Sequence, residues 1–273
     1  MPKFAANLSF LYQELPFLER VAAAAVDGFK GVECLFPYEV PPKEFKAALS
    51  ANGLQLCLFN APVGGLDAAS FASAWTRGER GTACIPGKAA EFRAGLQYAL
   101  AYARAVECPR VHVLSGIAPT SVPNNQLNET LRANLRWALK QAAQSQVTLM
   151  IEPLNARDVP GYFLRDQAQA HSIVQDIASP QLQVQMDLYH CQISEGDLAT
   201  KLRYYLPTGR VGHIQIAGVP GRHEPDVGEI NYPYLFELID QLGYDGWVGC
   251  EYKPRGGTVE GLEWLRQQRI RVI

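Results

Sequence analysis

Short β-rich runs alternate with longer segments of helical periodicity from one end of this chain to the other. The β-rich runs are residues 6–10, 31–36, 54–62, 110–116, 148–155, 182–190, 211–218 and 247–254. The helical segments are residues 14–26, 42–51, 88–106, 126–144, 165–177, 197–205, 232–242 and 259–268. Eight β/α units of this kind are what a closed (β/α)₈ TIM barrel of class α/β requires.

The main rival fold is an open, doubly wound sheet. No Gly-x-Gly-x-x-Gly follows the first β-rich run, and a count of eight units suits closure better. No linker or shift of composition divides the chain, so we expect one barrel domain over residues 1–273. The longest insertion, residues 63–87, follows the third run and would overhang the mouth of the barrel. It is either a lid or a surface excursion without a role.

Composition excludes several classes of protein. The net charge of −2 gives no basic excess, so we expect no nucleic-acid partner. The six cysteines are scattered without any Cys-x-x-Cys pair, which indicates buried, reduced thiols. The N-terminal residues lack the pattern of a secretory signal, and no segment reaches the roughly 20 apolar residues of a membrane span. We therefore expect a cytoplasmic protein with no membrane partner.

Polar side chains stand at the ends of four consecutive β-rich runs, where a barrel carries its active site. They are Glu152, Asp187, Gln215 and Glu251. An ionised carboxylate in such apolar surroundings is strongly disfavoured unless it is paired or bound to a cation, and three carboxylates at one point repel each other. A divalent cation removes both difficulties, and oxygen ligands of this kind suit Mg²⁺ or Mn²⁺ better than zinc.

The motifs around these residues resemble the hydroxypyruvate isomerase family, which includes the 2-oxo-tetronate isomerases and belongs to the wider xylose-isomerase-like TIM-barrel group. The motifs are MIEPLN (150–155), QMDLYH (185–190), HIQIAGVPGRHEP (213–225), GEINYPYLF (228–236) and GCEYKP (249–254). The opening FAANLSFLY and the stretches GVECLFPYE and FNAPVGG are similar to the same family. The resemblance thus covers essentially the whole chain.

The resemblance implies a divalent metal bound by Glu152, Asp187, Gln215 and Glu251, with Glu152 and Glu251 as the paired acid and base. The wider group often has histidine where Gln215 stands. The implied reaction converts hydroxypyruvate to 2-hydroxy-3-oxopropanoate, or isomerises a 2-oxo-tetronate, through a cis-enediol intermediate. The choice between a three-carbon and a four-carbon substrate stays open, as does the glutamate that acts first.

Four further residues are candidates for binding the substrate. His190 follows Asp187 by three residues, which places it beside the substrate oxygens as a hydrogen-bond donor. Arg222, His223 and Lys253 lie just beyond ligand-bearing runs, where a cation could receive the substrate carboxylate. Each of these three could equally be a solvated loop charge.

Other polar and aromatic residues are expected to have supporting roles. His112 lies inside a run and is expected in the core or beside the metal ligands, and Glu33 in the core or at the pocket floor. Six aromatic residues in or after the strand ends could exclude water from the intermediate, or could simply belong to the core. They are Phe10, Phe36, Tyr38, Phe59, Trp75 and Tyr162.

Three alternative functions stay open at this point. A ketose 3-epimerase would use the same two glutamates on a longer sugar in a roomier pocket. A multi-zinc endonuclease would need more histidine ligands and a basic groove, against which the five histidines and the net charge of −2 argue. A regulatory barrel that only binds a ligand would have residues unable to hold a metal at the four positions. A homo-oligomer is expected only because barrels commonly form them.

Overall fold

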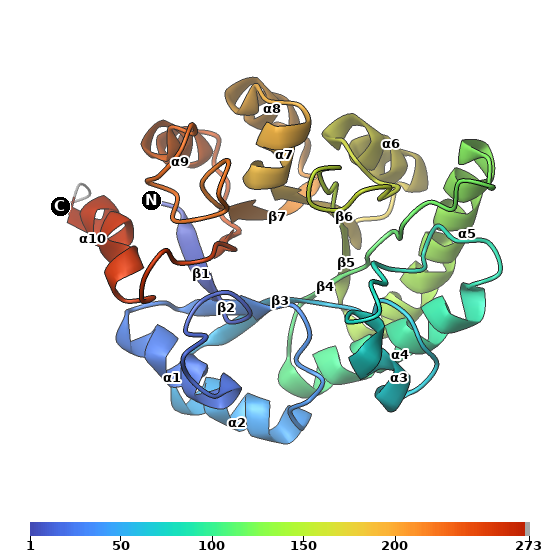
Figure 1. Ribbon diagram of the computed structural model, residues 1–273, viewed down its shortest axis with the longest axis horizontal. Coiled ribbons are helices and arrows are strands. Elements are labelled where there is room, and N and C mark those ends of the chain that lie inside the picture. The colour runs from blue at the N-terminus through green and yellow to red at the C-terminus, as the bar shows by residue number, and fades with distance from the viewer. Residues whose placement is uncertain (271–273) are drawn as a thin grey trace.

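A computed structural model describes residues 1–270 and has a closed barrel of eight parallel strands in chain order, as the sequence predicts (Figure 1). The strands are β1 (Lys3–Asn7), β2 (Gly31–Cys34), β3 (Gln55–Asn60), β4 (Arg110–His112), β5 (Thr148–Ile151), β6 (Leu182–Asp187), β7 (Val211–Ile216) and β8 (Trp247–Cys250). The barrel closes where β8 pairs in parallel with β1.

Helices form the outer ring around the strands (Figure 1). They are α1 (Phe17–Val26), α2 (Pro42–Ala51), α3 (Ala68–Ala74), α4 (Ala89–Val106), α5 (Asn124–Ala142), α6 (Gln167–Ile177), α7 (Leu188–Ser194), α8 (Leu198–Tyr205), α9 (Tyr232–Gln241) and α10 (Glu263–Ile270). Short 3₁₀ turns lie at Ala143–Ser145, Leu206–Thr208 and Glu260–Leu262. None of the described helices is long and apolar enough to cross a membrane.

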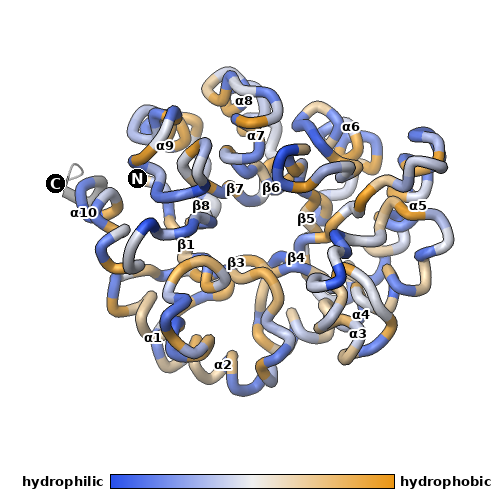
Figure 2. The backbone as a smooth tube through the Cα atoms, viewed as in Figure 1, coloured by the Kyte–Doolittle hydropathy of each residue, from blue (hydrophilic) through white to orange (hydrophobic). Residues whose placement is uncertain are grey.

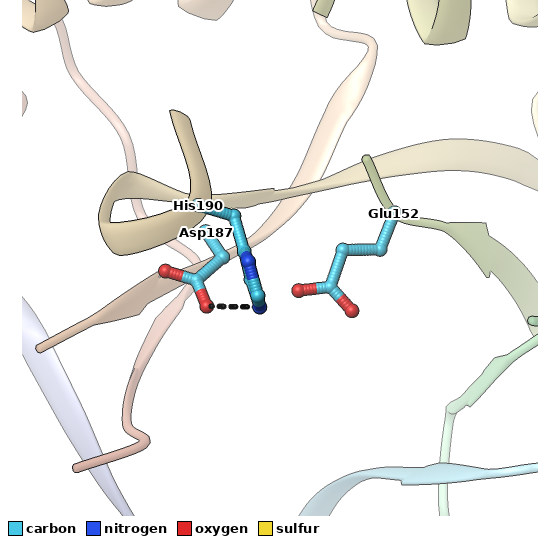
Figure 3. A group of neighbouring side chains, drawn as sticks. All are labelled: Glu152, Asp187 and His190. Atoms are coloured by element: carbon cyan, nitrogen blue, oxygen red, sulfur yellow. Dashed lines mark ion pairs between the residues drawn. The ribbon is translucent and has the colours of Figure 1, made fainter. Parts of the chain in front are cut away.

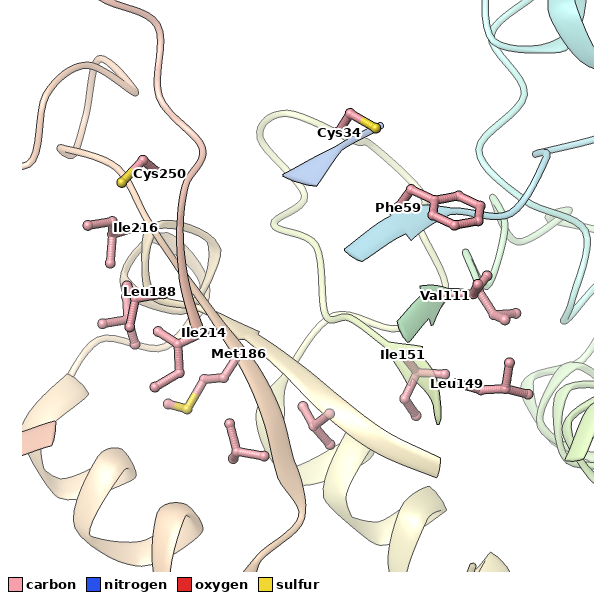
Figure 4. Packing of buried hydrophobic residues seen from close by; sticks show 14 of the residues in the cluster. Cys34, Phe59, Val111, Leu149, Ile151, Met186, Leu188, Ile214, Ile216 and Cys250 are labelled. Atoms are coloured by element: carbon pink, nitrogen blue, oxygen red, sulfur yellow. The ribbon is translucent and has the colours of Figure 1, made fainter. Parts of the chain in front are cut away.

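The core lies between the strands and the helix ring. Apolar strand residues such as Leu149, Ile151 and Ile214 are fully buried there, as Figure 4 shows from close by. The hydropathy colouring of Figure 2 shows hydrophobic stretches along β3 and β5 and hydrophilic turns at the outer edge of α2. All six cysteines are buried and free, as predicted.

Strand alternation explains why polar residues face the barrel interior while their neighbours join the core. Successive side chains of a strand point to opposite faces. On β7, Ile214 and Ile216 are core residues, whereas Gln215 between them lines an interior cavity. In the same way on β6, Gln185 lines the cavity, whereas its neighbour Met186 is a core residue.

All eight strands end two to four residues before the predicted runs do. The first run, 6–10, is shifted to Lys3–Asn7, because the N–H groups of Phe10 and Leu11 turn back to the carbonyl of Asn7. The run 182–190 was expected to be one strand, but it ends at Asp187 and continues as α7. The Asp187 side chain accepts a hydrogen bond from Tyr189 N at 2.7 Å and so caps this helix.

The insertion 63–87 contains a helix that the sequence pattern did not predict. Helix α3 begins with a capping box, in which the side chains of Asp67 and Ser70 each accept from the other's backbone N–H. Further along, the Arg80 guanidinium lies 3.7 Å from the ring of Trp75. The segment is therefore a folded element at the mouth of the barrel, and its role as a lid stays a prediction.

Candidate active site

The predicted polar residues meet at the C-terminal ends of the strands. Glu152 directly follows β5, Asp187 ends β6, Gln215 lies near the end of β7 and Glu251 directly follows β8. All four are at most 5 % exposed. A small cavity of about 90 Å³ lies here, and its lining includes Glu152, Gln215 and Glu251.

Glu152, Asp187 and His190 point toward one another (Figure 3). One ligand atom from each lies within 4.8 Å of those of the other two. Glu152 Oε1 and Asp187 Oδ2 are among the buried polar atoms of the described chain that have no hydrogen-bond partner. Buried carboxylate oxygens without a partner are costly unless something binds them. The two carboxylate oxygens without a partner fit a divalent cation with a preference for oxygen ligands.

Arg222 stands between two of the carboxylates. Its Nη2 donates to Glu251 Oε2 at 2.9 Å and lies 3.8 Å from Asp187 Oδ2. The guanidinium carbon also lies 5.1 Å from the centre of the Phe10 ring and 4.9 Å from that of Tyr189. Contacts with a carboxylate and with two ring faces hold the side chain in one place. Its Nε is a buried donor without a partner in the described chain.

Burial shifts the pKa of all three carboxyl groups upward. It raises the pKa of Glu251 to about 8, and the nearby charge of Arg222 opposes the rise. It raises the pKa of Asp187 to about 6, against Arg222 and the backbone N–H groups of Tyr189 and His190. For Glu152, burial and then the charges of Glu251 and Asp187 hold the pKa well above its usual value. The carboxyl groups therefore hold protons at a higher pH than free carboxyls do.

His190 has a defined tautomer. Its Nδ1 accepts from the Asn155 backbone N–H at 3.2 Å and lies 2.7 Å from Asn155 Nδ2. A backbone N–H can only donate, so Nδ1 carries no proton. Burial, followed by the charge of Arg222, lowers the pKa of His190 well below its usual value, so the ring is neutral. The proton therefore sits on Nε2, which lies 3.7 Å from Asp187 Oδ2.

The Gln215 amide is held at both ends. Its Nε2 donates to Glu33 Oε1 at 2.8 Å, and its Oε1 accepts from Gln185 Nε2 at 2.6 Å. An amide oxygen has two lone pairs, so Oε1 keeps one free for a further partner. Gln185 is not among the site residues predicted from the sequence, although it precedes Asp187 by two residues and lies on the same face of β6. Glu33 lines the cavity, as the pocket-floor alternative predicts.

His112 lies behind Glu152. Its Nδ1 is 3.1 Å from Asn60 Oδ1 and 3.5 Å from Glu152 Oε2. Burial lowers the pKa of His112 to about 3, so the ring is neutral. His112 therefore lies beside a predicted metal ligand, which is one of the two places expected for it.

His223 and Lys253 do not belong to the lining of the cavity. His223 Nδ1 donates to the Lys253 carbonyl at 2.8 Å, and Lys253 N donates to the Arg222 carbonyl at 2.8 Å. These contacts hold the Arg222 loop against the segment after β8. Of the three predicted cationic groups, Arg222 is the one that the structure brings to the carboxylates.

The six aromatic residues that could exclude water from the intermediate differ in their positions. Phe10 and Trp75 line the cavity. Phe36 lies behind Trp75, with ring centres 5.3 Å apart. The remaining three aromatic residues are not part of the cavity lining: Tyr38, Phe59 and Tyr162.

Comparisons with known proteins agree with this fold. The family model described as "Xylose isomerase-like TIM barrel" matches residues 21–268. A 2-oxo-tetronate isomerase of Cupriavidus necator is 52 % identical over 266 residues, which cover 97 % of this chain and 98 % of that protein. A hydroxypyruvate isomerase of Escherichia coli is 42 % identical over 269 residues, which cover 98 % of this chain and all (100 %) of that protein.

Solved structures share the fold. One described as an AP endonuclease of family 2 from Brucella melitensis is 45 % identical with a TM-score of 0.91, and the match covers 98 % of this chain and 99 % of that one. A 3-keto-D-glucoside 4-epimerase from E. coli has a TM-score of 0.77 at 21 % identity, over 98 % of this chain and 100 % of that one, which shows the fold alone. This chain therefore belongs to the hydroxypyruvate isomerase family, which includes the 2-oxo-tetronate isomerases, within the xylose isomerase-like TIM barrels, and it is an isomerase.

Proposed function

We propose that this chain isomerises a small hydroxy-keto acid, either hydroxypyruvate or a 2-oxo-tetronate, with the help of a divalent metal. The observation that carries the proposal is the pair of buried carboxyl groups, Glu152 and Glu251, with raised pKa values beside one small cavity. The printed names of relatives at 42–52 % identity support the same substrate class.

The two glutamates are suited to moving a proton between adjacent carbons. In this reaction one carboxylate removes a proton from the hydroxyl-bearing carbon and an enediol forms. A carboxylic acid then returns a proton to the former carbonyl carbon, while the hydroxyl proton passes from one substrate oxygen to the other. Burial raises the pKa of Glu251, and a bound cation would lower it again toward the range in which a carboxyl group both takes and returns a proton near neutral pH. Glu152 Oε1 has no protein partner and is free to face the substrate.

Glu152, Asp187, Gln215 and Glu251 would hold the metal. A Mg²⁺ or Mn²⁺ ion in that place supplies Lewis acidity for the two substrate oxygens on which negative charge develops. Each carboxylate has a second oxygen for a proton or a hydrogen bond. His190 is better suited to the substrate than to the ion, because its free ring nitrogen already carries a proton.

Arg222 and His190 would bind the substrate. Arg222 offers an unpaired Nε in addition to the Nη2 that contacts Glu251, and a planar guanidinium suits a carboxylate. His190 Nε2–H can donate to a substrate oxygen that becomes more negative during the reaction. These two donors orient a short acid against the two glutamates.

The cation at the cavity favours a short acid over the sugar of an epimerase. Arg222 lines the small cavity and has an Nε without a partner among the described residues, and a planar guanidinium suits a carboxylate. A ketohexose has no carboxylate for Arg222 to receive. The observations therefore favour the isomerase over the ketose 3-epimerase.

The test is an isomerisation assay on purified protein that has been stripped of metal and then resupplied with Mg²⁺ or Mn²⁺. Hydroxypyruvate and 2-oxo-tetronate are offered in parallel, with ketohexoses as a control. We expect metal-dependent turnover of a keto acid that is lost in Glu251→Gln and kept in Glu263→Gln, which changes an exposed residue of α10. Turnover of ketohexoses alone, or metal binding without any turnover, would overturn the proposal.

A further inference from the structure

We propose that Glu33 sets the orientation of the Gln215 side-chain amide, and so determines that Gln215 presents its oxygen to the metal side of the cavity. This inference rests on the proposed function, because it gives Gln215 Oε1 the part of a metal ligand. It assigns a positioning role to a buried residue that contacts no predicted substrate group.

The orientation can be followed from a fixed backbone donor. Ser9 N donates to Asn7 Oδ1 at 3.0 Å, and because a backbone N–H can only donate, the oxygen of the Asn7 amide must point there. The Asn7 nitrogen Nδ2 is then left to donate to Glu33 Oε1, at 2.9 Å. The Asn7 side-chain amide is thus oriented by a backbone N–H just after β1.

Glu33 also fixes the orientation of the Gln215 amide. A carboxylate offers acceptors only, and Gln215 Nε2 donates to the same Oε1 at 2.8 Å. The ring nitrogen Nε2 of His213 lies 2.5 Å from the other oxygen, Oε2. The Gln215 nitrogen must therefore face Glu33, and its oxygen must face away from it.

The far side of Gln215 is the side of the predicted metal ligands. Gln215 Oε1 accepts from Gln185 Nε2 at 2.6 Å, and both glutamines line the cavity together with Glu152 and Glu251. An amide turned the other way would present N–H donors to the cation and repel it. A neutral glutamine can serve as a metal ligand only in the orientation that Glu33 enforces.

Gly249 leaves room for the Glu33 side chain inside the barrel. Glu33 comes from β2, yet it meets two residues of β7, His213 and Gln215, by reaching across the barrel interior. It passes over Gly249 of β8, where a Cβ atom would lie 2.2 Å from Glu33 Oε2. The glutamate is 1 % exposed, so its partners are the groups named above.

The decisive variant is Asn7→Asp/Glu33→Gln, which keeps the shapes and the net charge but reverses the polarity of the shared contact. The aspartate at position 7 would accept from Ser9 N with one oxygen and from the new amide nitrogen at position 33 with the other. That nitrogen would then face Gln215, whose oxygen would turn toward position 33. Loss of such an outer partner typically weakens metal affinity by about 10- to 100-fold. We expect a loss of this size in Mn²⁺ affinity, measured by electron paramagnetic resonance of free Mn²⁺ without any substrate.

Glu33→Gln alone distinguishes orientation from simple damage. Asn7 Nδ2 still has to donate toward position 33, so the new amide would keep its oxygen toward Asn7 and Gln215 and turn its nitrogen to the His213 ring. We expect this single variant to bind Mn²⁺ more tightly than the double variant. Glu195→Gln, which changes a glutamate outside the cavity lining that accepts three hydrogen bonds, should bind Mn²⁺ as the wild type does.

Three outcomes would overturn the inference, and they separate it from the proposed function. Unchanged Mn²⁺ affinity in a folded Asn7→Asp/Glu33→Gln variant, or a Glu33→Gln variant that binds no more tightly than this double variant, removes the role of Glu33 and leaves the metal-dependent isomerase intact. Failure of the wild type to bind Mn²⁺ overturns both proposals together. Melting temperatures recorded in parallel show which variants are folded.

Discussion

The guanidinium of Arg222 lies against the carboxylate of Glu251, with Nη2 and Oε2 2.9 Å apart. The same nitrogen is 3.8 Å from Asp187 Oδ2. One cation thus opposes the rise that burial causes in the pKa of both carboxyl groups. In the proposed reaction Arg222 would act in two ways, as a receptor for the substrate and as a counter-charge for Glu251.

Replacing Arg222 by lysine should lower kcat/KM for the keto acid by roughly 30-fold, since one hydrogen bond to a charged group is worth about 2 kcal/mol. The lysine keeps the charge but loses the planar fork. The measurement is steady-state kinetics with Mn²⁺ at saturation. A variant with kinetics like those of the wild type would mean that Arg222 does not touch the substrate.

The metal-free protein should lose stability as the pH rises from 4.5, the ordinary pKa of glutamate, toward about 8, the value to which burial raises Glu251. Between these values the folded state binds more protons than the unfolded state, so the free energy of unfolding falls with rising pH. Thermal denaturation in the presence of a chelator measures the effect. Its dependence on pH should be shallower in Glu251→Gln, and an equal slope in the two proteins would contradict the prediction.

His190→Leu, which has no donor, should lower kcat by about 100-fold, as the loss of a donor to developing charge does. Mn²⁺ affinity should change little, because His190 Nε2 carries a proton and cannot coordinate a metal. Kinetics and Mn²⁺ titration on the same preparation separate the two effects. A large loss of Mn²⁺ affinity would instead place His190 among the metal ligands, with Glu152 and Asp187.

The strand-end residues could be predicted from the sequence because two local signals agree. Glu152, Asp187 and Glu251 each follow or end a run of apolar residues, and the C-terminal ends of parallel strands must meet in a barrel. The positions of such residues depend on the order of the strands and on little else. The barrel fold and the convergence of these residues could therefore be predicted without a structure.

The partners of Gln215 could not be predicted in the same way. The pairing of β6 with β7 shifts register between Val184 and Gln185, and Asp187 comes to lie beside Gln215. Glu33 reaches Gln215 from 182 residues away in the chain. Contacts of this kind depend on register and side-chain reach across the barrel, neither of which is encoded in a local pattern.

Trp75→Ala should broaden the range of substrate lengths. Trp75 lines both the catalytic cavity of about 90 Å³ and a neighbouring aromatic hollow of about 290 Å³. Removing the indole would join the two spaces, so relative kcat/KM should rise by roughly tenfold for each methylene added to a keto acid. Phe71→Ala is the matched control, because Phe71 lines the hollow but not the catalytic cavity. An unchanged ratio in Trp75→Ala would show that Trp75 does not limit the substrate.

Gly249→Ala should destabilise the fold by about 1–3 kcal/mol, the usual range for overpacking a core. The added Cβ would lie 2.2 Å from Glu33 Oε2, and neither the carboxylate nor its three partners can move without breaking hydrogen bonds. Urea denaturation measures the change, and Gly256→Ala is the control because nothing lies within 4 Å of its Cβ position. In a Glu33→Ala background the cost of Gly249→Ala should largely disappear, since the colliding group is gone. An equal cost in both backgrounds would mean that Gly249 is required by the β8 backbone itself, and not by the glutamate that crosses it.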